Sequence, residues 1–478
     1  MRAITAGGTF AAIAALVGCT TGPDYHAPTV ALAPTYLATS RVVVGSQAIS
    51  ADWWNGFGDP QLTRLVEQAL RDNQDIAQAA ARVAQARAGL RMSEAALLPS
   101  GQVSANAGYA YQSLETPTGR ALGAFPAFQR GTDLYDAGLG ASWEIDFFGG
   151  LRRGREAARA DWFASRAGLA AAQVAVAAET ADAYVAIRAL QRRIGIAEEQ
   201  EKTQARLTDV VGLRYRRGVA AEREWRQSEG ALAQVRAGIP VLRAGLVAAM
   251  TSLDVLLGRA PGTAQTELAK PAAIPAPPPL GNVGTPADLL RRRPDVIAAE
   301  QRLIAANARI GQAMAEYYPK ISLSALLGVA ATAPRALVGG SAVQGQGFAG
   351  LRWRLFDFKR IDAEIAAARG RDAEALAAYR QAVLRATKDV EDALSAVVER
   401  GAQAHTLEIG ETSLVRARDA SQAAYRGGVI SLFERLDADA RLLATRDARA
   451  QADAARTEAT IATFRALGGG WRPDHPAS

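Results

Sequence analysis

Few side chains in this sequence are of the types that perform catalysis or bind metals. Its 478 residues include three histidines, His26, His405 and His475, and a single cysteine, Cys19. A soft-metal site needs several such ligands close together, and one cysteine cannot form an intrachain disulfide. Nothing in the sequence pairs a nucleophile with a base. We therefore expect neither an enzyme nor a metal site, and we expect no cofactor apart from a group attached to Cys19.

The environment of Cys19 indicates lipid attachment. Met1-Arg2 supplies a positive start, residues 7–17 are apolar, and small residues precede the cysteine. The apolar run is too short to span a bilayer as a helix. The segment resembles the lipobox of bacterial lipoproteins, which implies cleavage of residues 1–18 as a signal peptide and acylation of Cys19. Thr20 at the next position implies sorting to the outer membrane. The alternative is an ordinary secretory signal with an unused thiol.

Two features that suggest other functions are explained more simply. The formal net charge of +7 could indicate nucleic acid, but the arginines alternate with acidic residues along predicted helices, as on a solvated helix surface. Gly345–Gly350 fits the G-x-G-x-x-G pattern of dinucleotide sites, but strand-like alternation follows it where such a site needs a helix. We expect neither nucleic acid nor a dinucleotide as a partner.

The sequence is an internal duplication. Shifted by 220 positions, residues 75–99 match residues 295–319, and beyond the first predicted strand the offset becomes 210, so that Trp143 meets Trp353. The ten-residue adjustment falls between two predicted strands, where a loop absorbs it. A Pro-rich stretch at 258–285 separates the halves and predicts an extended connector. Each half is therefore one structural repeat.

The predicted elements have the same order in both repeats. The first repeat, 59–257, comprises a helix over 59–98, a β-hairpin over 101–147, a long helix over 149–212 and a helix over 220–257. The second repeat, 286–467, comprises a helix over 286–318, a β-hairpin over 320–357, a long helix over 358–425 and a helix over 430–467. Residues 19–58 form a lipid-anchored segment that, with 258–285, makes an equatorial region, and 468–478 form a tail.

The predicted strands alternate between an apolar and a polar face. Val103, Ala105, Ala107, Tyr109 and Tyr111 share one face of the first strand, and polar or small residues occupy the other. Strands of this length cross a membrane when tilted. Four strands cannot close a barrel, and an open edge cannot face lipid, so membrane-spanning strands require several chains. A soluble sandwich with one wet face is the alternative.

The long helices are too long for one compact domain. A helix over 149–212 measures about 95 Å. Both long helices carry a 3-4 spacing of apolar and small residues in the same phase, which indicates coiled-coil packing. Each ends in a glycine-bearing turn, at 216–218 or 426–428, and a shorter helix returns. We therefore predict two helical hairpins.

The chain resembles a known family. The segments that carry the resemblance are 19–25 (CTTGPDY), 56–62 (GFGDPQL), 143–149 (WEIDFFG), 292–296 (RRPDV) and 425–429 (YRGGV). Together they resemble the outer membrane factors of bacterial efflux systems, the TolC-like proteins, and among these the OprM/NodT-type lipoproteins. The likeness runs in order through nearly the whole mature chain.

The resemblance implies an α+β membrane protein that works as a homotrimer. A 12-stranded outer-membrane barrel, four strands per chain, would continue into a long periplasmic α-helical barrel. It implies the channel of a tripartite efflux pump, with a periplasmic adaptor, an inner-membrane transporter of the RND type and outer-membrane lipid as partners.

The resemblance also assigns site residues. Glu434 and Asp437 would form acidic rings at the closed periplasmic aperture, so replacing both with alanine should raise conductance and weaken divalent-cation block. Ile430 stands where some relatives carry a basic residue, which argues against a salt bridge at this gate. The hairpin turns are candidate adaptor contacts: Tyr215, Gly218, Val219, Tyr425, Gly428 and Val429. The glycines could equally serve only to end the helices.

Two other functions fit parts of the sequence. A type I protein-secretion channel would use the same duct, although the lipobox favours efflux. A structural coiled-coil lipoprotein of the envelope would explain the helices, but it predicts neither conductance nor a detergent-resistant oligomer.

Overall fold

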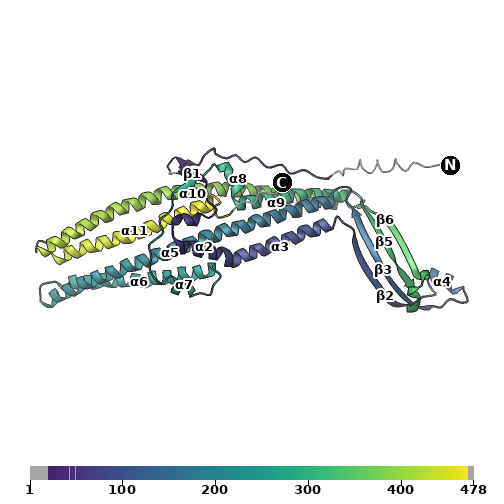
Figure 1. The fold of residues 1–478 in the computed structure, drawn as a ribbon, viewed down its shortest axis with the longest axis horizontal. Helices are drawn as coiled ribbons and strands as arrows, with labels where there is room; N and C mark the ends of the chain where they lie inside the picture. Colours follow the sequence, from purple (N-terminus) through teal and green to yellow (C-terminus); the bar gives the residue numbers. More distant parts are fainter. Residues whose placement is uncertain (1–19, 42–43, 49, 472–478) are drawn as a thin grey trace. The chain divides into compact units, whose positions relative to one another are not determined.

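The computed structural model describes residues 20–41, 44–48 and 50–471 (Figure 1). The predicted signal segment 1–18, Cys19 and the last seven residues of the predicted tail lie outside these described residues. The chain divides into two compact units. The first contains Ala84–Ala164 and Glu300–Ala378 together with the N-terminal segment up to Pro28, and the second contains Thr29–Val83, Ser165–Ala299 and the chain from Tyr379 onward.

The first unit is built on a four-stranded antiparallel sheet (Figure 1). Its strands are β2 (Ser100–Tyr111), β3 (Gly131–Ile145), β5 (Lys320–Ala331) and β6 (Val343–Arg352), in the order β2-β3-β5-β6. A short helix, α4 (Pro117–Gly123), lies in the loop of the first hairpin. β6 ends at Arg352, five residues before the predicted end of the second hairpin, because the chain turns there into the next helix.

One face of this sheet is apolar and uncovered within the chain. The β2–β3, β3–β5 and β5–β6 registers place the odd-numbered residues of all four strands on one face. Large side chains there are exposed, including Val103 at 80%, Leu327 at 63% and Leu351 at 67%. Apart from this sheet, the described residues contain only the two-stranded sheet β1–β4. The apolar face therefore needs a covering that residues 20–41, 44–48 and 50–471 do not provide.

The opposite face is polar and hollowed. It carries Ser100, Gln102, Ser142, Ser324 and Gln346, which line a cavity of about 460 Å³. Asn106 donates a hydrogen bond to Asp136 across β2 and β3 at 2.9 Å on this face. The two faces thus differ as they do in a barrel strand that separates lipid from water.

The helix that precedes each hairpin of strands is broken, which corrects two predictions. The range 59–98 holds α2 (Pro60–Asp72) and α3 (Gln74–Ala95), divided at Asn73, whose side chain accepts the Asp75 and Ile76 amides. The range 286–318 holds four pieces, η3 (Pro286–Asp288), α8 (Leu289–Arg292), α9 (Pro294–Met314) and η4 (Ala315–Tyr317). Arg293 is extended because a residue before proline disfavours the helical conformation.

Two long helical hairpins complete the repeats. α5 (Gly150–Arg216) pairs with α6 (Glu222–Leu256), and α10 (Phe358–Arg426) pairs with α11 (Leu432–Ala466), as Figure 1 shows. α5 extends four residues beyond its predicted end at 212, and the other ends lie within two residues of prediction. Within the second unit, ion pairs such as Arg193–Asp447 at 2.8 Å join α5 to α11.

α6 presents apolar side chains that the described part of the chain leaves uncovered. Val241, Val247 and Val255 are 70%, 49% and 62% exposed. Among the described helices, α6 alone is long and apolar enough to cross a membrane by length and composition, a test that the core helices of soluble proteins also pass. Its apolar face could equally be covered by a neighbouring protein chain.

The segment that joins the repeats is not simply extended, which corrects another prediction. It contains the five-residue helix α7 (Thr263–Glu267) and the strand β4 (Leu280–Asn282), which pairs in parallel with β1 (Val44–Ala48). The N-terminal part also contains η1 (Leu37–Arg41) and η2 (Trp53–Phe57). Trp53 stacks on Phe464 of α11 with ring centroids 5.2 Å apart, which holds η2 against the second repeat.

The duplication extends to individual contacts within each unit. Ser100 pairs with Ser142, and their equivalents Lys320 and Arg352 pair in the same way. Trp143 donates to the Leu97 carbonyl at 2.9 Å, and Trp353 donates to the Tyr317 carbonyl at 2.9 Å. Gly258 and Gly468, both with positive φ, approach the Asp72 and Arg292 carbonyls so closely that a Cβ atom would collide. The two repeats share their strand register as well as their element order.

Candidate functional site

The two hairpin turns have the same backbone geometry. The amide of Val219 donates to the Arg214 carbonyl at 2.9 Å, and that of Gly218 donates to the Tyr215 carbonyl at 2.8 Å. Val429 and Gly428 repeat this pattern with Ala424 and Tyr425. Both glycines have a φ of +72°. This is a Schellman motif, which ends a helix with a residue in the left-handed region.

The turns differ in how much surface they leave free. Val219 and Val429 are 63% and 79% exposed. Tyr215 stacks on Trp225 of the same hairpin at 5.2 Å between ring centroids, whereas Arg435 occupies the equivalent position of α11 and Tyr425 is 37% exposed. The second turn therefore offers both an aromatic and an aliphatic side chain, and the first offers mainly Val219.

Glu434 has a structural role besides the one predicted from the sequence. It is the third residue of α11, and its carboxylate accepts the Ser431 amide at 2.7 Å while its own amide donates to the Ser431 hydroxyl at 3.2 Å. This reciprocal pair is a capping box. The Ser431 amide and then its hydroxyl lower the pKa of Glu434 below its ordinary value. The other carboxylate oxygen remains available to a solute. The spacing S-x-x-E was readable from the sequence.

Asp437 is paired within its own helix. Its carboxylate contacts the Arg441 guanidinium at 2.8 Å, and both side chains are well exposed. The structure therefore places Glu434 and Asp437 in the first turns of α11 with part of their charge already compensated. Their first-repeat equivalents are Glu224 and Gln227, so the acidic pair is specific to the second hairpin.

The segment that follows Cys19 is held firmly against the first unit. The Thr21 hydroxyl donates to the Phe148 carbonyl at 3.0 Å and lies 3.1 Å from the Gly311 carbonyl. Arg153, whose side chain is 5% exposed, donates to the Thr21 carbonyl at 3.1 Å and to Asp24 at 2.7 Å. We call residues 20–25 the N-terminal strap. Phe148 lies three residues after β3, so the strap lies at that end of the sheet.

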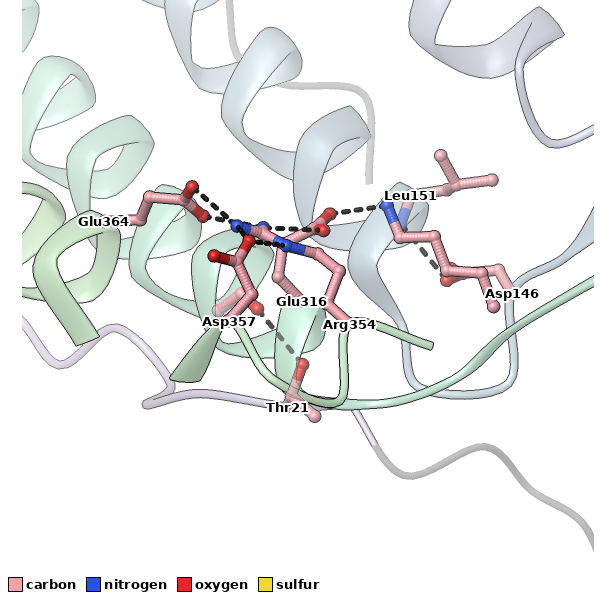
Figure 2. Close-up of polar contacts among 9 residues, drawn as sticks. Thr21, Asp146, Leu151, Glu316, Arg354, Asp357 and Glu364 are labelled. Carbon is pink, nitrogen blue, oxygen red and sulfur yellow. Dashed lines mark hydrogen bonds and ion pairs between the residues drawn. The ribbon is translucent and has the colours of Figure 1, made fainter. Parts of the chain in front are cut away.

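Charged side chains also fix the point where β6 becomes α10 (Figure 2). The Arg354 guanidinium binds both carboxylate oxygens of Glu364 at 3.0 Å and contacts Asp357 at 2.6 Å. It also contacts Glu316 at 3.3 Å. Burial would raise the pKa of Glu316, but hydrogen bonds and charges from Lys320 and Arg354 lower it below its ordinary value.

The corresponding point of the first repeat uses a different device. Asp146 accepts the Leu151 amide at 3.1 Å (Figure 2). It also accepts the Arg152 amide at 2.8 Å and so caps α5. Neither the role of Arg354 nor that of Asp146 was predicted from the sequence, since a single charged side chain leaves no periodic signal.

Comparisons with known proteins agree with this architecture. The family model described as outer membrane efflux protein matches residues 65–259 and 285–469. The pyoverdine export outer membrane protein OpmQ of Pseudomonas putida is 31% identical over 472 residues, which cover 96% of each chain. The cation efflux system protein CusC of Escherichia coli is 28% identical over 97% of this chain and 98% of its own. The solved structure of the outer-membrane channel OprN is 32% identical, has a TM-score of 0.84 and covers 95% of this chain and 100% of that one.

These matches extend over both repeats. The two segments of the family model coincide with the two repeats, and the matched family is one of transport proteins. The uncovered apolar face of the sheet and its polar opposite face are what an outer-membrane channel requires. The chain thus belongs to the outer membrane efflux protein family and acts as an outer-membrane efflux channel.

Proposed function

We propose that three copies of this chain form a continuous duct from periplasm to exterior, with a closed barrel of twelve strands in the outer membrane. The observation that carries this proposal is the sheet of four strands with an exposed apolar face and two unpaired edges, β2 and β6. An open edge cannot remain in lipid because its backbone groups would be unsatisfied. Pooling the strands of three chains removes every edge and gives a barrel wide enough for water.

The helical hairpins of the same three chains would enclose the periplasmic part of the duct. The exposed apolar side chains of α6 support this arrangement, because a neighbouring copy would cover them. Purified protein in detergent should behave as a trimer and form pores in planar bilayers. A monomer that needs no detergent, or a trimer without conductance, would contradict the proposal.

We propose that the chain works with a periplasmic adaptor and an inner-membrane transporter of the RND type to export small molecules. Support comes from two relatives whose names describe pyoverdine export and cation efflux. The adaptor would bind the hairpin turns, where Val219, Tyr425 and Val429 are exposed beside Gly218 and Gly428, which lack a side chain.

Cysteine crosslinking tests the adaptor contact. Val219→Cys and Val429→Cys should crosslink to an adaptor in cell envelopes and inhibit efflux, whereas Val247→Cys, on α6 away from the turns, should not. Absence of crosslinks at both turn positions would exclude the turns as the contact.

We propose that Cys19 carries covalent lipid that anchors the chain. The N-terminal strap supports this role, since it fixes Thr21, two residues after Cys19, at the end of β3, where the sheet would leave the membrane. Several acyl chains give firm anchoring, because each buried methylene contributes about 0.8 kcal/mol. Labelling with palmitate should be lost in Cys19→Ser, and unchanged labelling of that variant would contradict the assignment.

We propose that Glu434 and Asp437 form the acidic constriction of the resting channel. Three copies of each around a narrow axis would concentrate negative potential and attract cations. Because Arg441 compensates Asp437 and the cap engages only one oxygen of Glu434, most of the uncompensated charge comes from Glu434.

Single-channel recordings can separate the charge of Glu434 from its capping role. The pair Glu434→Gln with Asp437→Asn removes both charges and keeps the cap, since glutamine also forms a capping box. We expect higher conductance and weaker divalent-cation block in this variant and in the corresponding double alanine variant. The matched control is Glu224→Gln in the first hairpin. If only the alanine variant changes conductance, helix loosening and not charge is responsible.

A further inference from the structure

The two edges of the sheet are unpaired in the single chain, and the duplication indicates how they meet. β3 and β5 belong to different repeats, so their pairing is the contact between one repeat and the next. The equivalent of β3 in the second repeat is β6, and the equivalent of β5 in the first repeat is β2. β2 of a second copy would therefore pair with β6 of the first copy, just as β5 pairs with β3 inside one chain.

The pairing within each repeat shows that the duplication preserves register. Gly101 pairs with Ala141 in the first repeat, and the equivalents Ile321 and Leu351 pair in the second. The same agreement extends from Ser100–Ser142 to Tyr109–Asp133, whose equivalents are Lys320–Arg352 and Val329–Val343. The contact between repeats inside the chain is thus a sound template for the contact between chains.

We propose that β6 pairs antiparallel with β2 of a second copy of this chain in the register that places Trp353 opposite Val103 of the partner subunit. This register follows from Trp143–Leu323, the equivalent pair inside the chain. It places Leu351 opposite the partner's Ala105 and Arg352 opposite the partner's Ser104. The proposal rests on the trimeric assembly proposed above and specifies its seam residue by residue.

Side-chain size supports this register over its neighbours. Phe348, 61% exposed, would face the partner's Gly108, and Gly347 would face the partner's Tyr109, which is 67% exposed in the single chain. A Cβ atom on Gly108 or Gly347 would have no neighbour within 4 Å, so both positions have room for an aromatic ring. A shift of two residues in either direction places Phe348 opposite Asn106 or Ala110 of the partner subunit and loses this fit.

A shift of one residue is excluded by the faces of the sheet. Odd-numbered residues of β2 and β6 lie on the apolar face, and even-numbered residues lie on the polar face. A slip of one residue would turn an entire strand to the wrong face. The proposed register joins odd-numbered to odd-numbered and even-numbered to even-numbered residues, so each face of the sheet continues across the seam.

The seam continues beyond the strands. Inside the chain, Phe148 stacks on Tyr318 with ring centroids 4.5 Å apart at the contact between repeats. Their equivalents are Phe358, 45% exposed, and Leu98, 64% exposed. Contact of Phe358 with Leu98 of the partner subunit would cover both side chains.

Disulfide crosslinking on the polar face tests the register. The variant with Arg352→Cys and Ser104→Cys should give covalent trimers after oxidation, because directly opposed Cβ atoms lie about 5 Å apart. The two positions lie on strands at opposite edges of one sheet, about 14 Å apart, so a disulfide within one chain cannot form. Two controls combine Arg352→Cys with Gln102→Cys or with Asn106→Cys, so that the second cysteine lies two residues away from the proposed partner position. A third control, Arg352→Cys alone, reports any reaction of Cys19.

The outcomes distinguish the register from the assembly. Covalent trimers from the Ser104 pair, and several-fold less crosslinking from both controls, support the proposal. Stronger crosslinking of a control pair, or none from any pair in protein that still elutes as a trimer, overturns the register and leaves the trimer intact. Elution of the uncrosslinked variants and the unmodified protein as monomers overturns both. A second pair on the apolar face, Ala349→Cys with Ala107→Cys, repeats the test if the first variant fails to fold.

Discussion

A partly buried carboxyl group on α5 gives a sharp prediction about pH. Asp182 of α5 has one carboxylate oxygen that is buried without a hydrogen-bond partner. Burial, and next the charge of Glu458 on α11, raise the pKa of Asp182 from 3.8 to about 7, although Arg465 opposes the shift. Burial also raises the pKa of Glu458. Replacing Asp182 with asparagine removes the titrating group and keeps the side-chain shape.

The sign and size of the change in stability follow from the difference between the folded and unfolded pKa values of Asp182. Between pH 4 and pH 7 the folded chain holds a proton on Asp182 that the unfolded chain has lost, so stability falls as the pH rises through this window. Above pH 7 the loss is complete. A difference of about 3 pKa units corresponds to about 4 kcal/mol per chain, which is an upper limit because water and ions reduce it. Asp182→Asn should therefore stabilise the protein at pH 8 and change little at pH 4.

Thermal unfolding in detergent, followed by circular dichroism at both pH values, measures this effect. The matched control is Asp392→Asn at the equivalent position of α10, where the carboxylate is exposed and pairs with Lys388. We expect a higher midpoint for Asp182→Asn at pH 8 only, and no gain for Asp392→Asn at either pH. Equal shifts of Asp182→Asn at pH 4 and pH 8 would refute the reasoning, since they would show that titration is not the cause.

Three further predictions concern stability and local order. Gly428→Ala should lower the free energy of unfolding by about 1–2 kcal/mol because of the positive φ at this position. Gly468→Ala should lower it more, because its Cβ would also lie 2.6 Å from a carbonyl oxygen. Thermal unfolding measures both. Arg293→Met should cost about 2–3 kcal/mol in the same assay, because Arg293 is 11% exposed and binds Asp295, Asp389 and the Ala466 carbonyl. Gly311→Ala should displace the N-terminal strap, since its Cβ would lie 2.5 Å from the Thr21 carbonyl oxygen, and hydrogen exchange of residues 20–28 should then accelerate while that of β3 does not.

Periodicity and repetition made much of the fold predictable from the sequence. Alternation identified the strands, and the two offsets identified the duplication, including the loop that absorbs their difference. Glycine in the turns predicted the ends of α5 and α10 to within a few residues, because a left-handed residue leaves a clear local signal. The family resemblance supplied the partners and the acidic residues, which no pattern in the sequence would have identified.

Other features depended on signals that were present but not used. Arg293-Pro294 marks a helix break as clearly as Asp59-Pro60 marks a helix start, although the predicted helix runs across 286–318 without a break. Ser431 and Glu434 have the spacing of a capping box. By contrast, the contacts of Arg153 with the N-terminal strap join residues far apart in sequence, and a coil without periodicity gives no indication of where it lies.

The N-terminal strap can occupy only one of two equivalent positions. It crosses Gly311, where any Cβ atom would collide with the Thr21 carbonyl oxygen or the Arg153 side chain, and the first-repeat equivalent of Gly311 is Arg91. A lipid anchor attached there would transmit force to the junction between the two repeats of one chain. It would not transmit force to the interface between separate chains. Each subunit would then bear the force from the bilayer by itself. Lipid anchoring would therefore be mechanically independent of the strand pairing that closes the barrel.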